Sequence, residues 1–167
     1  PLSWINTAFP FASAYVVTTG RIDAALVIGT VFFLIPYNLA MYGINDVFDY
    51  ESDLANPRKG GMQGALVPRA HHRAILIAAT GSTVPFLIAL VLLGGPWSWA
   101  VLAVSMFAVV ACSAPGLRFK ERPFLDSATS SLHFVSPAIY GLVLASATPT
   151  WPLFAIVFAF FLWGMAS

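Results

Sequence analysis

Six long apolar stretches alternate with polar connections along this chain. A helix needs about 20 mostly apolar residues to cross the hydrocarbon core of a membrane, and each stretch reaches or approaches that length. Prolines within the stretches are tolerated in membrane helices, because neighbouring groups satisfy the carbonyls that proline frees. The pattern predicts an all-α fold, a polytopic membrane helical bundle with transmembrane helices at about 2–19, 24–44, 73–94, 97–115, 128–147 and 151–167.

The composition supports an integral membrane protein. Hydrophobic residues make up 59% of the 167 residues and charged residues only 9%, whereas soluble domains carry about 25% charged residues. We therefore treat residues 1–167 as a single transmembrane domain with the lipid bilayer as its main surroundings, and we expect no nucleic-acid partner. The single cysteine, Cys112, excludes a disulfide within the chain.

The basic residues gather in the two longer connections, 45–72 and 116–127. Seven of the eight Lys and Arg residues lie in or beside these connections, and only Arg21 lies on the opposite side. Counting helices puts both connections on the same face of the membrane, and an excess of Lys and Arg marks the cytoplasmic face. We expect a multi-pass protein of the cell (plasma) membrane whose two longer loops face the cytoplasm.

An acidic motif at the end of the second stretch is the main candidate for chemistry. Four of the seven acidic residues lie between Asp46 and Asp53. On a helix, at about 100° per residue, Asn45, Asp46, Asp49 and Asp53 share an arc of about 100°, while Glu51 points elsewhere. Mg²⁺ prefers oxygen ligands and is usually shared between one or two carboxylates and substrate phosphates. We predict that Asn45, Asp46, Asp49 and Asp53 bind Mg²⁺ and that the three aspartates are catalytic; a solvated acidic helix end is the alternative.

Two basic segments lie on the same side as the acidic motif. The first, Asn56–Gly61, carries Arg58 and Lys59 next to the acidic motif, and an ordinary positive-inside loop is the alternative interpretation. The second segment runs from Ser113 to Asp126. Its basic residues Arg118, Lys120 and Arg122 occupy alternate positions, so that in an extended loop they face one side. A diphosphate needs metal ions and cations to neutralise its charge. The predicted substrate-binding residues are Asn45, Arg58, Lys59, Arg118, Lys120 and Arg122. Asp126, which follows, is predicted to be the N-cap of the fifth helix.

These motifs resemble those of the UbiA-type membrane prenyltransferase superfamily. The pattern from Asn45 to Asp53 is similar to its first aspartate-rich motif, and Ser113–Pro123 is similar to the basic loop after its fourth helix. The chain is most similar to the lycopene elongases of C50 carotenoid biosynthesis. The segments that carry this similarity are Pro1–Phe11, Phe33–Asp53, Asn56–Gly61 and Phe161–Ser167. Cys112 stands where these relatives usually have tyrosine.

The resemblance implies a Mg²⁺-dependent enzyme that moves an allylic isoprenoid group, such as dimethylallyl, from its diphosphate to a lipophilic acceptor, such as the carotenoid lycopene. It also implies nine helices around a central cavity and a second aspartate-rich motif after the sixth helix. We therefore expect the sequence to be truncated at its C-terminus, with six of nine helices, and to be inactive alone.

Two other functions are compatible with parts of the sequence. A prenyltransferase with an aromatic or quinone-precursor acceptor shares every predicted metal residue. A fragment of a membrane transporter is the alternative without catalysis, but transporters place charged residues within helix interiors along a pathway. Here the charges lie almost wholly in two loops, which favours the enzyme.

Overall fold

The computed structural model describes residues 4–57 and 66–166, and its regular elements there are all helical. Arg58, Lys59 and most of the first basic segment lie outside the described residues. The elements are α1 (Ile5–Thr19), α2 (Ala24–Leu34), α3 (Pro36–Phe48), α4 (Tyr50–Leu54), α5 (Arg69–Leu93), α6 (Pro96–Ser113), η2 (Phe119–Glu121), α7 (Pro123–Leu144) and α8 (Trp151–Ala166).

Each apolar stretch of the sequence folds as helix, which confirms the all-helical membrane class. Three helices are long and apolar enough to cross a membrane: Ala24–Phe48, which joins α2 and α3, Arg69–Leu93 and Pro96–Ser113. Within the described residues, α1 and α8 have 15 and 16 residues, which is short for a full crossing. The 22 residues of α7 include a polar N-terminal half. The six expected helices are thus present, and three of them meet the length and composition of a full span.

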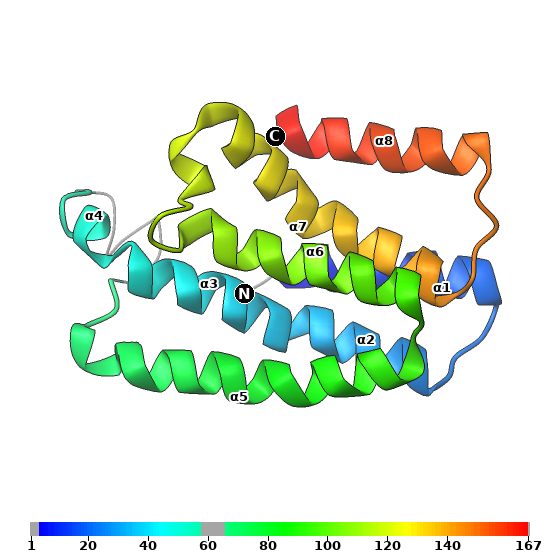
Figure 1. Cartoon of the computed structure of the whole chain (residues 1–167), viewed down its shortest axis with the longest axis horizontal. Coiled ribbons are helices and arrows are strands. Elements are labelled where there is room, and N and C mark those ends of the chain that lie inside the picture. The colour runs from blue at the N-terminus through cyan, green and yellow to red at the C-terminus, as the bar shows by residue number, and fades with distance from the viewer. Residues whose placement is uncertain (1–3, 58–65, 167) are drawn as a thin grey trace.

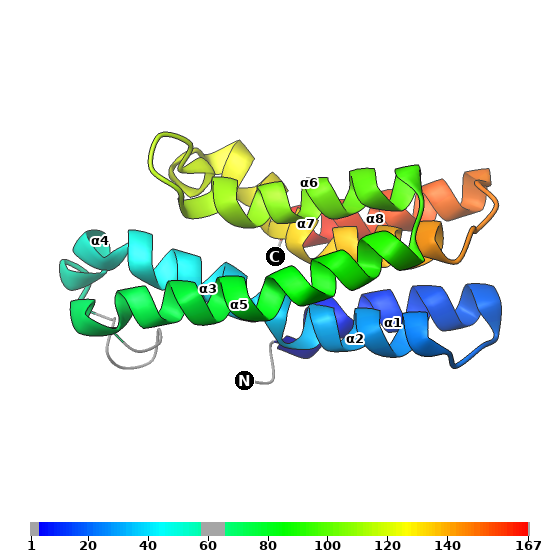
Figure 2. The same ribbon diagram turned by 60° about the horizontal axis from the view of Figure 1, so that its bottom comes forward.

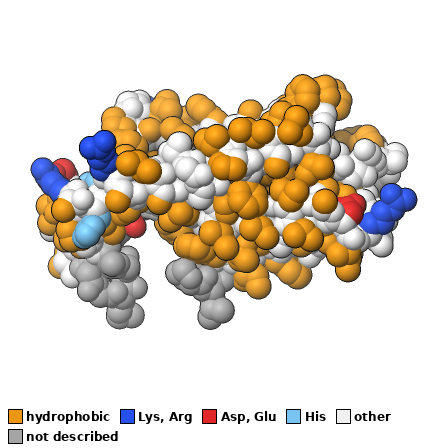
Figure 3. Space-filling model, turned by 90° about the horizontal axis from the view of Figure 1, so that it is seen from below, with side chains coloured by type: hydrophobic (Ala, Val, Ile, Leu, Met, Phe, Trp, Pro, Cys, Tyr) orange, Lys and Arg blue, Asp and Glu red, His pale blue; other side chains and the backbone are white. Residues whose placement is uncertain are grey.

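The two longer connections lie at the same end of the bundle. Figure 1 shows α4 and the turn between α6 and α7 together at the left, and the short connections at the right. The view turned by 60° keeps this arrangement (Figure 2). Figure 3 shows hydrophobic side chains over the middle of one face and Lys and Arg near its two ends. The acidic motif and the second basic loop therefore share one polar end.

The second span is broken at a proline. Pro36 has no N–H to donate and its ring crowds the preceding turn, so the helix ends at Leu34 and α3 begins at Pro36. Polar side chains satisfy the carbonyls at the break: Thr7 Oγ1 and Asn38 Nδ2 donate to Phe33 O at 2.6 and 2.7 Å. The break lets α2 pack on α1 while α3 packs on α5 and α6.

An aromatic cluster fixes the inner part of the bundle. Phe11, Phe32, Phe33, Tyr37 and Tyr140 are fully buried and come from α1, α2, α3 and α7. Their ring centroids lie 4.9 Å apart for Phe32 and Phe33 and 5.3 Å apart for Phe33 and Tyr37. Such pairs contribute about 0.5–1.5 kcal/mol each beyond the area they bury. The cluster forms a rigid base from which α3 extends to the polar end.

The start of α7 differs from the sequence prediction. The helix begins at Pro123 with Arg122 as its N-cap, and Asp126 lies within the first turn. Proline is favoured at the first helical position because its missing N–H would be unpaired there in any case. The prediction that Asp126 is the N-cap was therefore wrong. Its carboxylate instead lies in the first turn, where the helix dipole favours negative charge.

Candidate functional site

The acidic motif follows a nearly continuous helical path. Asp49 separates α3 from α4, yet its backbone stays right-handed with φ −95° and ψ −1°. Its N–H donates to Asn45 O at 2.9 Å, and the N–H of Asp53 donates to Asp49 O at 2.8 Å. The helical spacing on which the predicted ligand set depends is therefore kept through Asp53.

Asp49 is the buried centre of the site. It is only 2% exposed, and its Oδ2 forms an ion pair with Lys120 Nζ. Arg118 Nη2 lies 4.0 Å from Oδ1 of the same carboxylate. Two of the three basic residues predicted in the second loop thus reach the acidic motif. The third, Arg122, is exposed at the N-cap of α7.

Asn45 is held by the end of a neighbouring helix. Its Oδ1 accepts a hydrogen bond from Ser113 Oγ at 2.8 Å and lies 3.5 Å from Lys120 Nζ. Ser113 is buried at the last position of α6. Ser113 was not among the predicted site residues, although a small polar residue that ends an apolar helix beside a basic loop is a usable signal. Ser113 and Lys120 together orient the Asn45 side chain.

The second basic loop is compact rather than extended. Phe119–Glu121 form a short 3-10 helix, and Arg118 adopts a left-handed conformation with φ 41° and ψ 53°, which is uncommon for a residue other than glycine. Arg118 Nε also pairs with Glu121 Oε1 at 2.8 Å. The prediction of an extended loop with three cations on one side was wrong, although Arg118 and Lys120 still face Asp49.

The ion pair between Asp49 and Lys120 is largely removed from water. The Lys120 side chain is 23% exposed and that of Asp49 is 3% exposed. Burial lowers the pKa of Lys120, while the carboxylates of Glu121 and Asp126 act in the opposite direction. Removing one partner of such a pair leaves a charge without its counter-ion, which is strongly unfavourable.

The other acidic residues of the motif have different surroundings. Asp46 and Asp53 are half-buried and both have interaction partners. Glu51 is exposed and pairs with Arg69 at the start of α5, and the Arg69 guanidinium lies 5.2 Å from the centre of the Tyr50 ring. Glu51 therefore belongs to a separate surface cluster, as its position on the helix predicted.

The residues at the site fit part of a Mg²⁺ shell. Among the described residues, no three His, Cys, Asp or Glu side chains form a metal cluster. However, Asn45 Oδ1 and Asp49 Oδ2 converge on a single positive charge, the ammonium of Lys120. Asp49 Oδ1 is also buried and accepts no hydrogen bond from the part of the chain that the structure describes. Amide and carboxylate oxygens suit Mg²⁺, so binding of this ion stays a prediction that the donor set supports.

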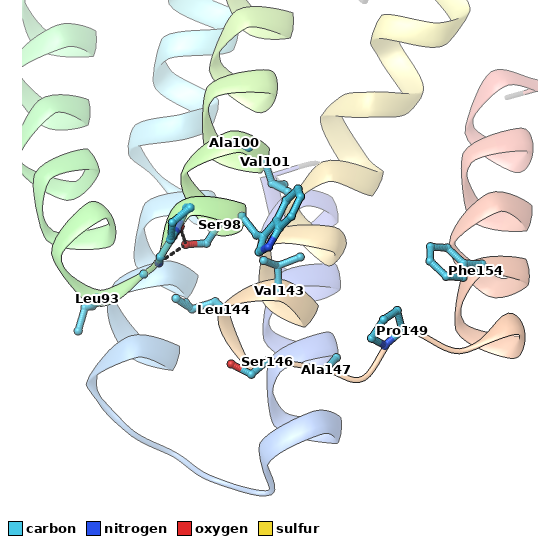
Figure 4. A pocket seen from close by; sticks show the side chains of 14 residues that line it. Leu93, Ser98, Ala100, Val101, Val143, Leu144, Ser146, Ala147, Pro149 and Phe154 are labelled. Carbon is cyan, nitrogen blue, oxygen red and sulfur yellow. Dashed lines mark hydrogen bonds between the residues drawn. The ribbon is translucent and has the colours of Figure 1, made fainter.

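A large apolar pocket lies at the other end of the bundle. Figure 4 shows it between the α5–α6 and α7–α8 connections, with Val101, Leu144 and Phe154 among its lining residues. Its volume is about 860 Å³ and none of its lining residues is charged. Val101, the last lining residue on α6, is 12 positions (113 − 101) before Ser113, which corresponds to roughly 18 Å of helix. The pocket offers space for hydrocarbon and not for a diphosphate.

Fold and site together define a helical membrane protein that joins an acidic motif to a basic loop at one end of its bundle. The sequence profile of the UbiA prenyltransferase family matches residues 7–167, and the chain belongs to this family. Membership favours the enzyme over the transporter alternative.

Three relatives show how the chain compares with longer proteins. It is 62% identical over 167 residues to the C(50) beta-cyclic carotenoids biosynthesis protein LbtBC of a Dietzia species, covering all of this chain and 39% of that protein. It is 54% identical to a lycopene elongase/hydratase of Corynebacterium glutamicum, covering 58% of it. A lycopene elongase/hydratase of Halobacterium salinarum is 34% identical over 174 residues, with 99% of this chain and 59% of that protein covered. The chain thus spans 39–59% of the length of these three relatives. No solved structure matches.

Replacing Ser113 with alanine tests the support of Asn45. In the full-length protein, Ser113→Ala should weaken the predicted Mg²⁺-dependent diphosphate binding by about tenfold, because side chains that orient metal ligands typically contribute that much and Asn45 is a predicted ligand. Titration of the purified protein with pyrophosphate at fixed Mg²⁺ measures this. Ser105→Ala is the control, since Ser105 is also buried on α6 but donates only to Val101 O of its own helix. Equal affinities in the two variants would contradict a role for Ser113.

Proposed function

We propose that the full-length protein is a Mg²⁺-dependent prenyltransferase that moves an allylic group from its diphosphate to a carotenoid. The donor is dimethylallyl diphosphate and the acceptor is a carotenoid such as lycopene. The observation that carries this proposal is the similarity over the whole chain to proteins named lycopene elongase/hydratase. The meeting of the acidic motif and the second basic loop at Asp49 supports the diphosphate part of it.

The site residues are proposed to form two sets, one that binds the metal ion and one that binds the diphosphate. The proposed metal ligands are Asn45, Asp46, Asp49 and Asp53, of which the aspartates are the catalytic residues. The bound ion would neutralise charge on the departing diphosphate. The proposed diphosphate-binding residues are Asn45, Arg58, Lys59, Arg118, Lys120 and Arg122. Their cationic groups suit phosphate oxygens because charge-assisted hydrogen bonds are the strong ones.

The proposed reaction begins when the carbon–oxygen bond to the diphosphate breaks and leaves an allylic cation. An electron-rich double bond of the acceptor then attacks this cation and forms the new carbon–carbon bond, which leaves a cation on the acceptor that is discharged by loss of a proton or by capture of water. The helical bundle excludes water, which protects the cation from premature hydrolysis. The apolar pocket at the far end of α6 provides further space for the hydrocarbon of a long acceptor.

The protein is proposed to lie in the cell (plasma) membrane with both longer loops in the cytoplasm. The excess of Lys and Arg at this end supports the orientation. Residues 1–167 alone are proposed to be inactive, because they supply one aspartate-rich motif while their relatives extend well beyond the aligned part.

Expression in lycopene-producing cells tests the proposed acceptor. The full-length protein should convert lycopene to products larger by one or two five-carbon units, measured by chromatography with mass spectrometry. Residues 1–167 expressed in the same way should leave lycopene unchanged. An absence of longer carotenoids, together with prenylation of an aromatic acid or quinone precursor by the same membranes, would establish the aromatic-acceptor alternative instead.

A further inference from the structure

Lys120 occupies the place where two proposed metal ligands meet. Its Nζ forms an ion pair with Asp49 Oδ2 and lies 3.5 Å from Asn45 Oδ1. Amide and carboxylate oxygens suit Mg²⁺, and an ion held by the same two oxygens would take the place of the ammonium. The ammonium and the ion therefore compete for one position.

The burial of Asp49 strongly favours a cation at this position. The carboxylate is 2% exposed, and an ionised carboxylate away from water is costly unless it is paired. Arg118 approaches the other oxygen only to 4.0 Å and is also paired with Glu121. Lys120 is thus the principal counter-ion of Asp49 in the metal-free protein.

The loop that carries Lys120 has features suited to a change of position. Arg118 is left-handed with φ 41°, and Gly116, at the start of the loop, has φ 89°. Non-glycine residues in sparsely populated conformations often occur at ligand clamps and switch segments. The lysine side chain itself is a point charge on a flexible four-carbon stem, so its ammonium can turn from Asp49 to a nearby anion without unfolding the loop.

We propose that Lys120 is a tethered counter-ion that fills the metal position in the free protein and turns to the diphosphate when the metal enters. Metal binding frees the ammonium for the diphosphate, and diphosphate binding draws the ammonium away from the metal ligands. Because such coupling is reciprocal, each ligand tightens the binding of the other. The inference rests on the proposed function of this site and adds an account of how its two ligands cooperate.

The test measures metal and diphosphate binding separately in the purified full-length protein. Mn²⁺, followed by electron paramagnetic resonance, serves as the metal probe, and inorganic pyrophosphate at saturating Mn²⁺ serves as the anion probe. Lys120→Gln should bind Mn²⁺ alone about tenfold more tightly than the wild type and bind pyrophosphate about tenfold more weakly, within the usual range of coupling between sites. A residue with only a structural role would not shift the two affinities in opposite directions.

Two variants separate this effect from a general loss of charge. Arg73→Gln removes the same charge from an exposed position near the start of α5 and should change Mn²⁺ affinity alone by less than about twofold, because exposed charges are screened. Lys120→Arg keeps a cation and should keep the weak Mn²⁺ binding of the wild type. Unchanged or weaker Mn²⁺ binding by Lys120→Gln overturns the inference and leaves the proposed function standing. A wild-type protein that binds neither Mn²⁺ nor pyrophosphate overturns both.

A measurement on the wild type removes any dependence on the folding of the variants. Mn²⁺ without pyrophosphate should speed acetylation of Lys120 by a water-soluble, amine-reactive acetylating reagent, because the ammonium leaves Asp49. Addition of pyrophosphate should slow it again. Mass spectrometry of the loop peptide reports the rate, and a labelling rate that Mn²⁺ does not alter overturns the inference.

Discussion

Replacing Asp49 with asparagine in the full-length protein should reduce the proposed prenyl transfer by about 100-fold or more while the protein still inserts in the membrane. The amide keeps the size of the side chain but removes the negative charge that attracts Mg²⁺. Loss of a single well-placed electrostatic contact in an active site costs about 10²–10³ in rate. It also leaves Lys120 and Arg118 without their shared carboxylate. Transfer of labelled dimethylallyl groups by isolated membranes measures the loss.

Asp23→Asn is the matched control for this variant. Asp23 caps α2 at the opposite end of the bundle, where its side chain accepts hydrogen bonds from Leu26 N–H and Tyr15 Oη. This variant loses the same charge and should keep the wild-type rate per folded molecule. An Asp49→Asn protein that retains more than half of the wild-type rate would refute the assignment of the site.

Gly141→Ala should lower the stability of the bundle by at least about 2 kcal/mol, a cost typical of an overpacked interface. Gly141 lies where α7 crosses α1. A Cβ added there would lie 2.6 Å from Phe11 O, 3.2 Å from Ala14 Cβ and 3.3 Å from Tyr15 N. Two of these atoms belong to the backbone of α1, so the helix itself must move. A lower midpoint of thermal unfolding in detergent is the expected observation.

Gly81→Ala is the control for this substitution, and we expect it to cause no loss of stability. Gly81 is on α5, and a Cβ there would have nothing within 4 Å. Because alanine is favoured over glycine within helices by up to about 1 kcal/mol, this variant should unfold at the same temperature as the wild type or higher. Equal destabilisation by the two substitutions would show that loss of glycine, and not the close helix contact, is responsible.

The sequence predicted the helices well and their ends less well. Hydropathy detects the part of a helix that lipid or core requires to be apolar, so it located the middle of each segment. It placed the start of the third helix at residue 73, whereas α5 begins at Arg69, because basic residues are good helix formers that hydropathy does not count. The break before Pro36 was also missed, because hydropathy does not report which backbone hydrogen bonds a helix makes.

The candidate site was predicted at the level of loops and not of atoms. Charge and helix count placed the motif of Asn45 and Asp49 beside the loop of Arg118 and Lys120, and the structure brings these residues together. Their catalytic and binding roles stay predictions. The hydrogen bond from Ser113 to Asn45 was not predicted because it depends on how α6 packs against α3. The left-handed conformation of Arg118 was not predicted because alternating basic residues do not indicate it.

The contact between Lys120 and Asn45 also bears on how the protein is made. The two residues are 75 positions apart in the chain, and a ribosome adds about 5–20 residues per second, so roughly 4–15 s separate their synthesis. During that interval Asp49 lacks Lys120 and Arg118, the two cations that approach it in the folded protein. Water and other cations must balance Asp49 at the membrane edge until η2 emerges. Burial of this carboxylate is therefore a late step of biogenesis, after α6 has been inserted.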